Sequence, residues 1–281
     1  MPGPPEDLAV GARLGEYLLE QVLGEGGMGI VFRAVRETDG ETVALKVLRR
    51  ELSQDETYRR RFVHEARAAG EVRERHLVPV LDAGEQDGRS YLAVAFIPGK
   101  TLEQRIASEG PLPIADVVRI TAEIGAGLDA LHAAELIHRD VKSSNVILAE
   151  GDGAMLTDFG LAKGRAYTVL TRPGQVMGTL DYIAPEMIRG QPASPASDIY
   201  ALGCLIYECL RGHAPFAEKA VYAVATAHLD EEPEDPCAGR GDCPEGFGWA
   251  VLRALEKEPA RRPGTATAYA QMLGLAARGS G

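Results

Sequence analysis

The pattern of apolar residues changes at Pro98–Lys100, and this change limits the possible folds more than any other feature of the chain. Before it, short apolar or β-branched runs are separated by glycine-rich turns, which is typical of antiparallel strands. These runs are Tyr17–Leu23, Ile30–Arg36, Thr42–Leu48, Leu77–Leu81 and Ser90–Ile97. After it, apolar residues recur with helical periodicity. The helical segments are Ile114–His132, Ser197–Leu210, Lys219–His228, Phe247–Glu256 and Thr265–Ala277.

We therefore expect an α+β protein with two lobes. Residues 14–97 form the small lobe, with antiparallel strands plus one helix, Asp55–Arg75, and residues 98–278 form a larger, mostly helical lobe. The apolar stripe of the first helix consists of Tyr58, Phe62, Ala66 and Ala69. Ser197–Leu210 is apolar almost all round, so it is expected to be buried in the larger lobe. Residues 1–13 are rich in Pro and Gly and are expected to be disordered.

The composition excludes several classes of protein. The chain has 281 residues, 45% of them hydrophobic and 25% charged, which is ordinary for a folded protein and excludes disorder or a collagen-like repeat. Its 30 Lys and Arg residues face 41 Asp and Glu residues, a net charge of −11. No dense basic run is present, and the triplet Arg59–Arg61 is interpreted as a solvated helix face, so nucleic-acid binding is not expected.

Neither a membrane span nor a secretory signal is expected. The longest apolar run, Ile199–Tyr207, has nine residues, whereas a spanning helix needs about 20. The first ten residues lack the basic and apolar regions of a signal peptide. A cytoplasmic location is the expectation that follows.

The cysteines form two pairs. Cys204 and Cys209 lie in a helical pattern and are expected to be buried small apolar residues. Cys237 and Cys243 flank a glycine-rich loop and, with His228, supply only three ligands at loose spacing. We expect neither a metal site nor a disulfide there.

Glycines at Gly24, Gly26 and Gly29 have G-x-G-x-x-G spacing. The same spacing opens a helix in dinucleotide-binding folds, but here it joins two strands. Backbone amides freed of side chains would close over a polyphosphate, with Val31 free to lie against a flat base. An ordinary glycine hairpin is the alternative.

Lys46 lies in the apolar strand that follows, where an ammonium group needs an anionic partner. A nucleotide phosphate and Glu65, at the polar border of the helical stripe, are both available. The alternative is a lysine that extends from a strand edge into solvent.

The densest signal is His138-Arg139-Asp140-Val141-Lys142-Ser143-Ser144-Asn145, followed by Asp158-Phe159-Gly160. Asp140, Asn145 and Asp158 are expected to converge on loops that bracket two short strands, Val146–Leu148 and Ala154–Leu156. Hard oxygen ligands of this kind suit magnesium better than a transition metal.

These residues resemble the signature set of protein kinases. The resemblance covers about residues 16–275 and includes Ala184-Pro185-Glu186 and the segment that starts at Asp198. It is closest in character to the catalytic domains of eukaryotic-like (Hanks-type) bacterial serine/threonine kinases. The implied fold is the bilobal protein-kinase fold, and the implied reaction is transfer of the ATP γ-phosphate to Ser or Thr hydroxyls of proteins.

The resemblance also implies roles for single residues. Asp140 and Lys142 would be catalytic, and Asn145 and Asp158 would bind Mg²⁺, with Mn²⁺ as a substitute. The implied ATP-binding residues are Leu23, Gly24, Gly26, Gly27, Gly29, Val31, Ala44, Lys46, Glu65, Ala95 and Ile97. The implied structural residues are His138, Arg139, Phe159, Thr179, Glu186, Asp198 and Arg262, with Glu186 and Arg262 as a buried ion pair.

Specificity and regulation can be read in the same way. Lys142, two places after Asp140, is typical of Ser/Thr specificity. Adenine would dock on the backbone of Ala95 and Ile97, and Ser143 replaces a common proline without expected consequence. Arg139, beside Asp140, is typical of kinases whose activation loop is ordered by a phosphate that faces this arginine, so Thr171 and Thr168 are predicted autophosphorylation sites.

Two other functions remain open at this point. A pseudokinase would signal by shape alone, but the three residues that such proteins lose, Lys46, Asp140 and Asp158, are present. A small-molecule kinase is disfavoured by Ala184-Pro185-Glu186 and the long loop before it.

Expected partners are ATP, protein substrates and a second copy for trans-autophosphorylation. The chain is either a complete cytoplasmic enzyme or the cytosolic part of a membrane-anchored receptor kinase.

Overall fold

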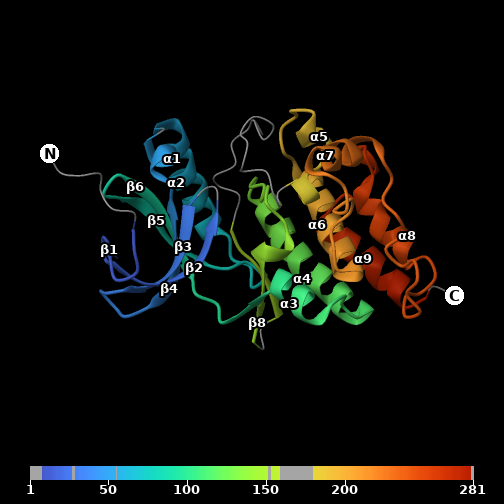
Figure 1. Ribbon diagram of the computed structural model, residues 1–281, viewed down its shortest axis with the longest axis horizontal. Helices are drawn as coiled ribbons and strands as arrows, with labels where there is room; N and C mark the ends of the chain where they lie inside the picture. Colours follow the sequence, from blue (N-terminus) through green and yellow to red (C-terminus); the bar gives the residue numbers. More distant parts are fainter. Residues whose placement is uncertain (1–7, 27–28, 55, 151–152, 159–179, 280–281) are drawn as a thin grey trace. The chain divides into compact units, whose positions relative to one another are not determined.

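The computed structural model describes residues 8–26, 29–54, 56–150, 153–158 and 180–279. The chain divides into two compact units (Figure 1). Unit 1 contains residues 1–71 and 78–97, and unit 2 contains residues 72–77 and 98–281. Each unit is described separately below.

Unit 1 is built on an antiparallel sheet. In its described part, six strands lie in the order β1-β2-β3-β4-β6-β5. Their bounds are β1 (Arg13–Leu14), β2 (Tyr17–Gly26), β3 (Gly29–Arg36), β4 (Thr42–Leu48), β5 (Val80–Gln86) and β6 (Arg89–Ala95). Strands β1 to β4 pair in sequence order. Strand β6 then pairs with both β4 and β5, so it lies between them.

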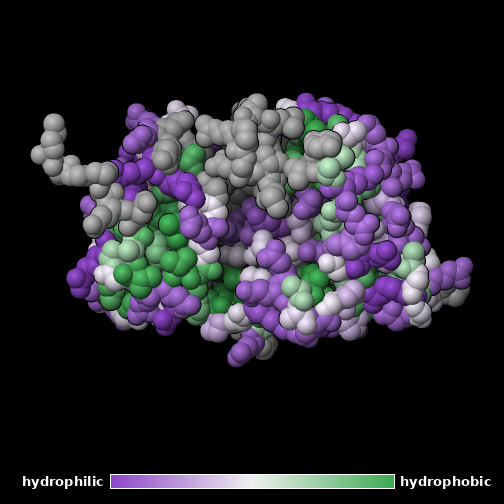
Figure 2. Space-filling model, viewed as in Figure 1, coloured by the Kyte–Doolittle hydropathy of each residue, from purple (hydrophilic) through white to green (hydrophobic). Residues whose placement is uncertain are grey.

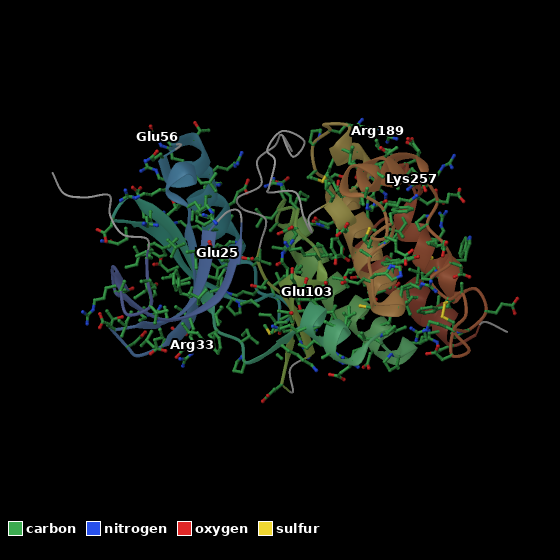
Figure 3. All side chains as sticks on the ribbon, viewed as in Figure 1. Glu25, Arg33, Glu56, Glu103, Arg189 and Lys257 are labelled. Atoms are coloured by element: carbon green, nitrogen blue, oxygen red, sulfur yellow. A yellow bond between two sulfur atoms is a disulfide. The ribbon has the colours of Figure 1, made fainter. Side chains whose placement is uncertain are left out.

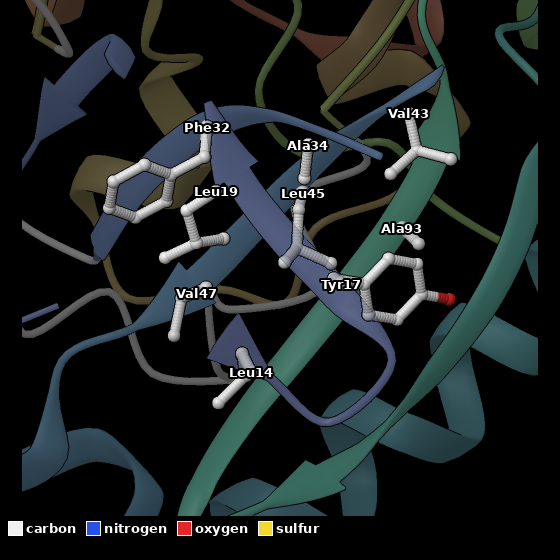
Figure 4. Close-up of a cluster of buried hydrophobic side chains, with 9 residues drawn as sticks. All are labelled: Leu14, Tyr17, Leu19, Phe32, Ala34, Val43, Leu45, Val47 and Ala93. Carbon is white, nitrogen blue, oxygen red and sulfur yellow. The ribbon is translucent and has the colours of Figure 1, made fainter. Parts of the chain in front are cut away.

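One face of this sheet carries the core of unit 1 (Figure 4). The buried side chains alternate along β2, β3 and β4, as strand geometry requires. They are Leu14, Tyr17, Leu19, Phe32, Ala34, Val43, Leu45, Val47 and Ala93. The intervening residues, Lys46 among them, therefore lie on the opposite face.

Two helices accompany the sheet, α1 (Arg50–Gln54) and α2 (Glu56–Glu71). The helix predicted at Asp55–Arg75 corresponds to α2, which ends earlier, at Glu71, and α1 was not predicted. Phe62, Ala66 and Ala69 are buried, which confirms the predicted stripe at these positions, and α2 packs against β5. The strand predicted at Leu77–Leu81 is wrong in position. Leu77 belongs to unit 2, where it forms an isolated bridge with Leu156, and β5 begins only at Val80.

Unit 2 is mostly helical. Its main helices are α3 (Leu102–Glu109), α4 (Ile114–Ala133), α5 (Pro185–Ile188), α6 (Pro195–Arg211), α7 (Val221–Asp230), α8 (Phe247–Leu252) and α9 (Ala266–Ala277). A small sheet has the order β7 (Gly99–Thr101), β8 (Val146–Ala149), β9 (Gly153–Leu156). The helix predicted at Phe247–Glu256 is interrupted, because a 3-10 turn, η4 (Arg253–Leu255), follows α8.

Helix α6 is the centre of unit 2, with α4 and α9 packed beside it (Figure 1). Every residue from Ser197 to Leu210 is buried, which confirms the prediction from the apolar pattern. The helix begins with a capping box between Ser194 and Ser197, and it ends at Gly212, whose φ of 82° favours glycine. Asp129 of α4 accepts the backbone N–H groups of Ala266 and Thr267 at 2.9 Å each and so caps α9.

The structure corrects the interpretation of the second cysteine pair. Cys237 and Cys243 form a disulfide (Figure 3, yellow bond), with their Cα atoms 5.7 Å apart. Gly239, with a φ of 78°, allows the tight turn between them. Cys204 and Cys209 are buried free thiols, as predicted.

The disulfide-closed loop is anchored through Arg240. Its guanidinium donates to the carbonyls of Leu210 at 2.7 Å and Leu112 at 2.9 Å. From the other side, Arg211 donates to the carbonyl of Ala238 at 2.9 Å. The loop therefore satisfies the carbonyl of Leu210 in the last turn of α6 and that of Leu112 just before α4.

The viewed surface differs between the units. Hydrophobic areas gather over the strands of unit 1, while unit 2 is mostly hydrophilic on this face (Figure 2). On β2, Val22 is 47% exposed and Leu23 is 43% exposed. Among the described residues, no helix is both long and apolar enough to span a membrane.

Candidate active site

Asp140, Lys142 and Asn145 converge in the segment between α4 and β8. The side-chain amide of Asn145 donates to the backbone carbonyl of Asp140 at 2.8 Å and to its Oδ2 at 3.1 Å. The Nζ atom of Lys142 lies 3.3 Å from the same Oδ2. A 3-10 turn, η1 (Ser143–Asn145), closes the segment, because the N–H of Asn145 donates to the carbonyl of Lys142 at 3.0 Å. The Asp140 side chain is 14% exposed, so it is held firmly but still reached by solvent.

Asp198 of α6 holds the backbone just before this cluster. Its Oδ2 accepts the N–H of His138 and its Oδ1 accepts the N–H of Arg139, both at 2.8 Å. Arg139 has a φ of 63°, a conformation that costs a non-glycine residue roughly 1–3 kcal/mol. Nε2 of His132 also lies 2.8 Å from Oδ2 of Asp198. The buried carboxylate therefore stabilises a backbone turn that is unfavourable in isolation.

His138 is neutral and buried, and its ring connects the backbone of Asp140 with that of Thr157. The N–H of Asp140 donates to its Nδ1 at 3.3 Å, which assigns the ring proton to Nε2, 3.1 Å from the carbonyl oxygen of Thr157. Burial lowers the pKa of His138, and the nearby charges of Asp198 and Asp140 only partly oppose that effect. A neutral ring suits a structural role.

Asp158 lies at the same end of the β8–β9 hairpin as Asn145. The register pairs Val146 with Leu156, and the next residue, Thr157, donates its N–H to the carbonyl of Asn145 at 2.9 Å. Asp158 follows directly, with a φ of 61°. Carboxylate and amide oxygens are the ligands that Mg²⁺ prefers. The pairing of the two strands therefore supplies a donor set that fits a hard divalent cation.

In unit 1, Lys46 lies on the face of the sheet opposite the core. Its partners in register are Val31 on β3 and Leu92 on β6. Ala44, two residues earlier, shares this face because side chains alternate along a strand. Lys46 thus extends from the face that also carries Val31, Ala44 and Leu92. Glu65 on α2 is half-buried and adjacent to the buried Ala66.

The glycines of the β2–β3 hairpin differ in whether neighbouring atoms leave room for a side chain. A Cβ atom at Gly29 would lie 2.1 Å from the carbonyl oxygen of Val47, so the sheet itself excludes a side chain there. A Cβ atom at Gly24 or Gly26 would meet no described atom within 4 Å. Packing within the described residues explains Gly29 but not the other two. The open space beside Gly24 and Gly26 fits a ligand that approaches the backbone.

The residues expected to contact adenine lie at the ends of strands. Leu23 is an exposed apolar side chain on β2, next to Gly24. Ala95 ends β6, and its N–H donates to the carbonyl of Pro79 at 2.9 Å. Ile97 is the last residue of unit 1. Since the amide of Ala95 is already engaged, any hydrogen bond from Ala95 to a base would use its carbonyl.

Glu186 and Arg262 form a buried ion pair in unit 2. The guanidinium nitrogens donate to the two carboxylate oxygens at 2.7 and 2.8 Å, and the side chains are 4% and 0% exposed. Ser197 also donates to Glu186, at 2.7 Å. Burial alone would raise the pKa of Glu186, but the hydrogen bonds and charge of Arg262 bring it below its ordinary value.

Several predicted site residues lie outside the described part of the chain. These are Gly27, Phe159, Thr168, Thr171 and Thr179. Within the described part, no group of three or more His, Cys, Asp or Glu side chains is placed to hold a metal ion. The candidate cation site therefore depends on the amide of Asn145 as well as on carboxylates.

One group beside the site was missed from the sequence. Ser143, Tyr182 and Glu208 are joined by hydrogen bonds in unit 2. The sequence does contain an indication of this group, because Glu208 is a carboxylate within a helix that is otherwise apolar almost all round. A buried carboxylate needs hydrogen-bond partners, and their identity depends on the fold.

Comparison with known proteins identifies the family. A profile of the protein kinase domain matches residues 17–272. The serine/threonine-protein kinase PknH of Mycobacterium bovis is 37% identical over 92% of this chain and 43% of its own length. PknE of Mycobacterium tuberculosis is 39% identical over 90% of this chain and 44% of its own length. The serine/threonine-protein kinase pkn3 of Myxococcus xanthus is 38% identical over 95% of this chain and 51% of its own length.

Solved structures agree with this assignment. The crystal structure of the M. tuberculosis PknI kinase domain has a TM-score of 0.79 with this chain and 28% sequence identity. The match covers 97% of this chain and 100% of that one. The chain belongs to the protein kinase domain family, and the predicted protein-kinase fold is confirmed. It spans about two fifths to one half of the length of these curated relatives. Members of the family generally use ATP and a divalent metal ion.

Proposed function

We propose that the chain is an active serine/threonine protein kinase domain. The observation that carries this proposal is the convergence of Asp140, Lys142 and Asn145, held by hydrogen bonds of 2.8 and 3.1 Å and an ion contact of 3.3 Å. Phosphoryl transfer needs little covalent help, so alignment and charge neutralisation supply most of the catalysis. This cluster provides a base, a cation and a metal-binding amide within one short segment.

Each of these residues has a defined task in the proposed reaction. Asp140 orients the Ser or Thr hydroxyl and accepts its proton, because it is the carboxylate of the cluster and its side chain is 14% exposed. Lys142 offsets negative charge on the transferred group from a position beside Asp140. Asn145 and Asp158 would hold Mg²⁺ or Mn²⁺, and a bound cation would neutralise charge on the phosphate oxygens.

The nucleotide is proposed to bind through unit 1. The hairpin backbone at Gly24 and Gly26 would approach the phosphates, and Lys46 would bind them with its ammonium group. Val31, Ala44 and Leu23 would contact the flat apolar base, while the carbonyl of Ala95 and the backbone of Ile97 would hydrogen-bond to it. Glu65 would keep Lys46 aimed at the phosphates.

A phosphotransfer assay on a generic basic protein tests the proposal. We expect Asp140→Asn to lower kcat by roughly 100- to 10,000-fold, the usual contribution of a general base. Lys46→Ala is expected to be similarly impaired. Lys100→Ala, which removes an exposed lysine paired with Glu109, is the matched control and is expected to behave like the parent. A parent chain that binds ATP but transfers no phosphate would be a pseudokinase, and the proposal would be wrong.

The glycine hairpin offers a second test. Gly26→Ala is expected to leave the unfolding free energy unchanged within about 0.5 kcal/mol, because the added methyl meets open space. Its KM for ATP is expected to rise. Gly29→Ala is expected to destabilise the fold by about 1–3 kcal/mol through its clash with Val47. An unchanged KM in Gly26→Ala would argue against phosphate binding at the hairpin.

Regulation is proposed to follow the same chemistry. Thr171 and Thr168 are proposed autophosphorylation sites, modified in trans by a second copy, with the phosphate facing Arg139. Mapping phosphosites by mass spectrometry after incubation with ATP and Mg²⁺ checks this. An active preparation with both threonines unmodified would contradict it.

We place the reaction in the cytoplasm, where ATP is available. The disulfide between Cys237 and Cys243 is unusual for that compartment, since reducing conditions keep most cytosolic thiols reduced. Measuring the redox state of these cysteines in protein trapped from cells tests the placement. Full oxidation of Cys237 and Cys243 to the disulfide in cells would count against a cytoplasmic location.

A further inference from the structure

Three side chains from separate parts of unit 2 meet beside the catalytic segment. The Oγ atom of Ser143 lies 3.0 Å from Oε1 of Glu208 and 3.2 Å from the hydroxyl of Tyr182. The Tyr182 hydroxyl lies 2.6 Å from Oε2 of Glu208. Ser143 begins η1, Tyr182 ends the 3-10 turn η3 (Leu180–Tyr182), and Glu208 lies in α6. The three contacts form a closed ring.

The ring is buried, so its hydrogen bonds cannot be replaced by water at low cost. Ser143 is 1% exposed and Glu208 is 9% exposed. A buried carboxyl group without hydrogen-bond partners would cost several kcal/mol. The two hydroxyl groups are therefore required where they are.

A count of protons shows when the ring is complete. An ionised Glu208 leaves two protons, one on each hydroxyl, for three oxygen–oxygen contacts, so one contact has no hydrogen bond. A neutral Glu208 adds a third proton. Its protonated oxygen then donates to one hydroxyl, that hydroxyl donates to the other hydroxyl, and the other hydroxyl donates to the second carboxyl oxygen, which only accepts. Burial raises the pKa of Glu208 above its ordinary value, and the carboxylates of Glu103 (on α3, Figure 3) and Asp181 act in the same direction. The hydrogen bonds from Tyr182 and Ser143 oppose this rise only in part.

The ring is connected to the catalytic cluster by one turn of backbone. Ser143 follows Lys142 directly, and its own turn η1 ends at Asn145. Asn145 in turn donates to Asp140 at 2.8 and 3.1 Å. An anchor on Ser143 therefore limits the movement of both neighbours that approach Asp140. A proline at this position would have no hydroxyl and could not form the anchor.

We propose that Ser143 is a positioning residue of the phosphotransfer reaction, which anchors the turn carrying Asn145 to α6 through a closed ring with Tyr182 and Glu208. The inference rests on the proposed kinase function. Ser143 touches none of the reacting groups and acts through Lys142 and Asn145.

Ser143→Ala is the direct test. We expect kcat for phosphotransfer to fall about tenfold, while the KM for ATP stays within about twofold, because the anchor orients catalytic groups and does not touch the nucleotide site of unit 1. Tyr182→Phe removes another member of the ring and is expected to have a similar effect on kcat. Ser108→Ala is the matched control, since Ser108 is an exposed serine that bonds only to backbone carbonyls of its own helix.

Glu208→Gln tests whether the site needs the closed hydrogen-bonded ring or the negative charge of the carboxylate. The glutamine amide donates to one hydroxyl while its oxygen accepts from the other, so the ring stays closed with three hydrogen bonds. We expect kcat within about twofold of the parent. Glu208→Ala opens the ring and is expected to match Ser143→Ala. A Glu208→Gln variant as impaired as Ser143→Ala would overturn the ring, because it would show that the carboxylate charge is needed.

The controls distinguish failure of this inference from failure of the proposed function. If the parent is active and Asp140→Asn is not, but Ser143→Ala retains full kcat, the inference is wrong and the function stands. If the parent transfers no phosphate, the NMR signals of the Asn145 side-chain amide remain informative. They are expected to shift in Ser143→Ala but not in Ser108→Ala, and unchanged signals would overturn the inference.

Discussion

Two glutamates in unit 2, Glu186 and Glu208, are both buried, but their pKa values are shifted in opposite directions. They are 3% and 9% exposed. Burial raises the pKa of each carboxyl group. For Glu186, hydrogen bonds and charge from Arg262 reverse this effect, and the net pKa lies below its ordinary value. For Glu208, the hydroxyls of Tyr182 and Ser143 do not reverse it, and the net pKa lies above its ordinary value.

For these two carboxyl groups the partner, and not the depth of burial, decides the direction in which the pKa is shifted. A guanidinium group offers two parallel hydrogen bonds and a full positive charge, which favour the ionised form. Hydroxyl groups can donate to an ionised carboxylate or accept from a neutral acid, so they discriminate weakly between the two forms. The same residue type therefore gives a fixed ion pair at one site and an adaptable ring at the other.

The largest expected effect comes from breaking the ion pair. Arg262→Ala leaves the carboxylate of Glu186 buried without its cation and removes bonds to the carbonyls of Glu256 and Ala196. We expect a loss of about 3–5 kcal/mol in unfolding free energy, measured by urea denaturation. Arg60→Ala breaks an exposed pair with Glu56 and is expected to cost about 0.5 kcal/mol or less. Equal costs for the two variants would contradict the role assigned to burial.

A smaller effect is expected from Glu186→Gln, which keeps the shape but removes the charge. We expect a loss of about 1.5–3 kcal/mol at neutral pH, the usual worth of hydrogen bonds to a charged group. Because the folded pKa of Glu186 is lowered, its stabilisation is complete above the ordinary value near 4.5 and is lost as the pH falls through the folded pKa. The difference between parent and variant should therefore shrink in acid. Urea denaturation at pH 7 and below 4.5 measures it, and a difference independent of pH would contradict the assignment.

The smallest effect is expected from Glu208→Gln, and its pH dependence has the opposite sign. The folded pKa of Glu208 is raised, so its contribution to stability is complete below the ordinary value near 4.5 and is lost as the pH rises through the folded pKa. The glutamine variant does not ionise. We expect it to be within about 1 kcal/mol of the parent in acid and to gain relative to the parent as the pH rises. A relative loss on raising the pH would show that Glu208 is an ordinary stabilised carboxylate.

Much of the fold could be predicted because its signals are local. The alternation in Thr42–Leu48 and the helical periodicity of Ile114–His132 each depend on neighbours a few residues apart, and both elements form as expected. The segment from His138 to Asn145 carries its chemistry in one stretch, and the structure brings Asp140, Lys142 and Asn145 together. The roles assigned to these residues remain predictions.

What could not be predicted depends on contacts between distant segments. Ser143 and Glu208 are 65 residues apart, so a serine that seemed a neutral replacement acquires a buried partner only in the folded chain. Leu77 is apolar and strand-like, yet it belongs to unit 2 and forms an isolated bridge with Leu156 instead of extending β5. The spacing of Cys237 and Cys243 fits a loop of any shape, and only the turn at Gly239 brings the sulfur atoms together.

The loop closed by Cys237 and Cys243 has a consequence for handling the protein. Arg240, inside that loop, binds the carbonyl of Leu210 in the last turn of the central helix α6, so the oxidation state of the two cysteines affects the hydrogen bonding at the end of that helix. A purified sample can contain two species that differ by two hydrogen atoms and separate in an intact-mass spectrum. The thiol reagent in the buffer is therefore an experimental variable, and stability values from different preparations are comparable only when it is the same.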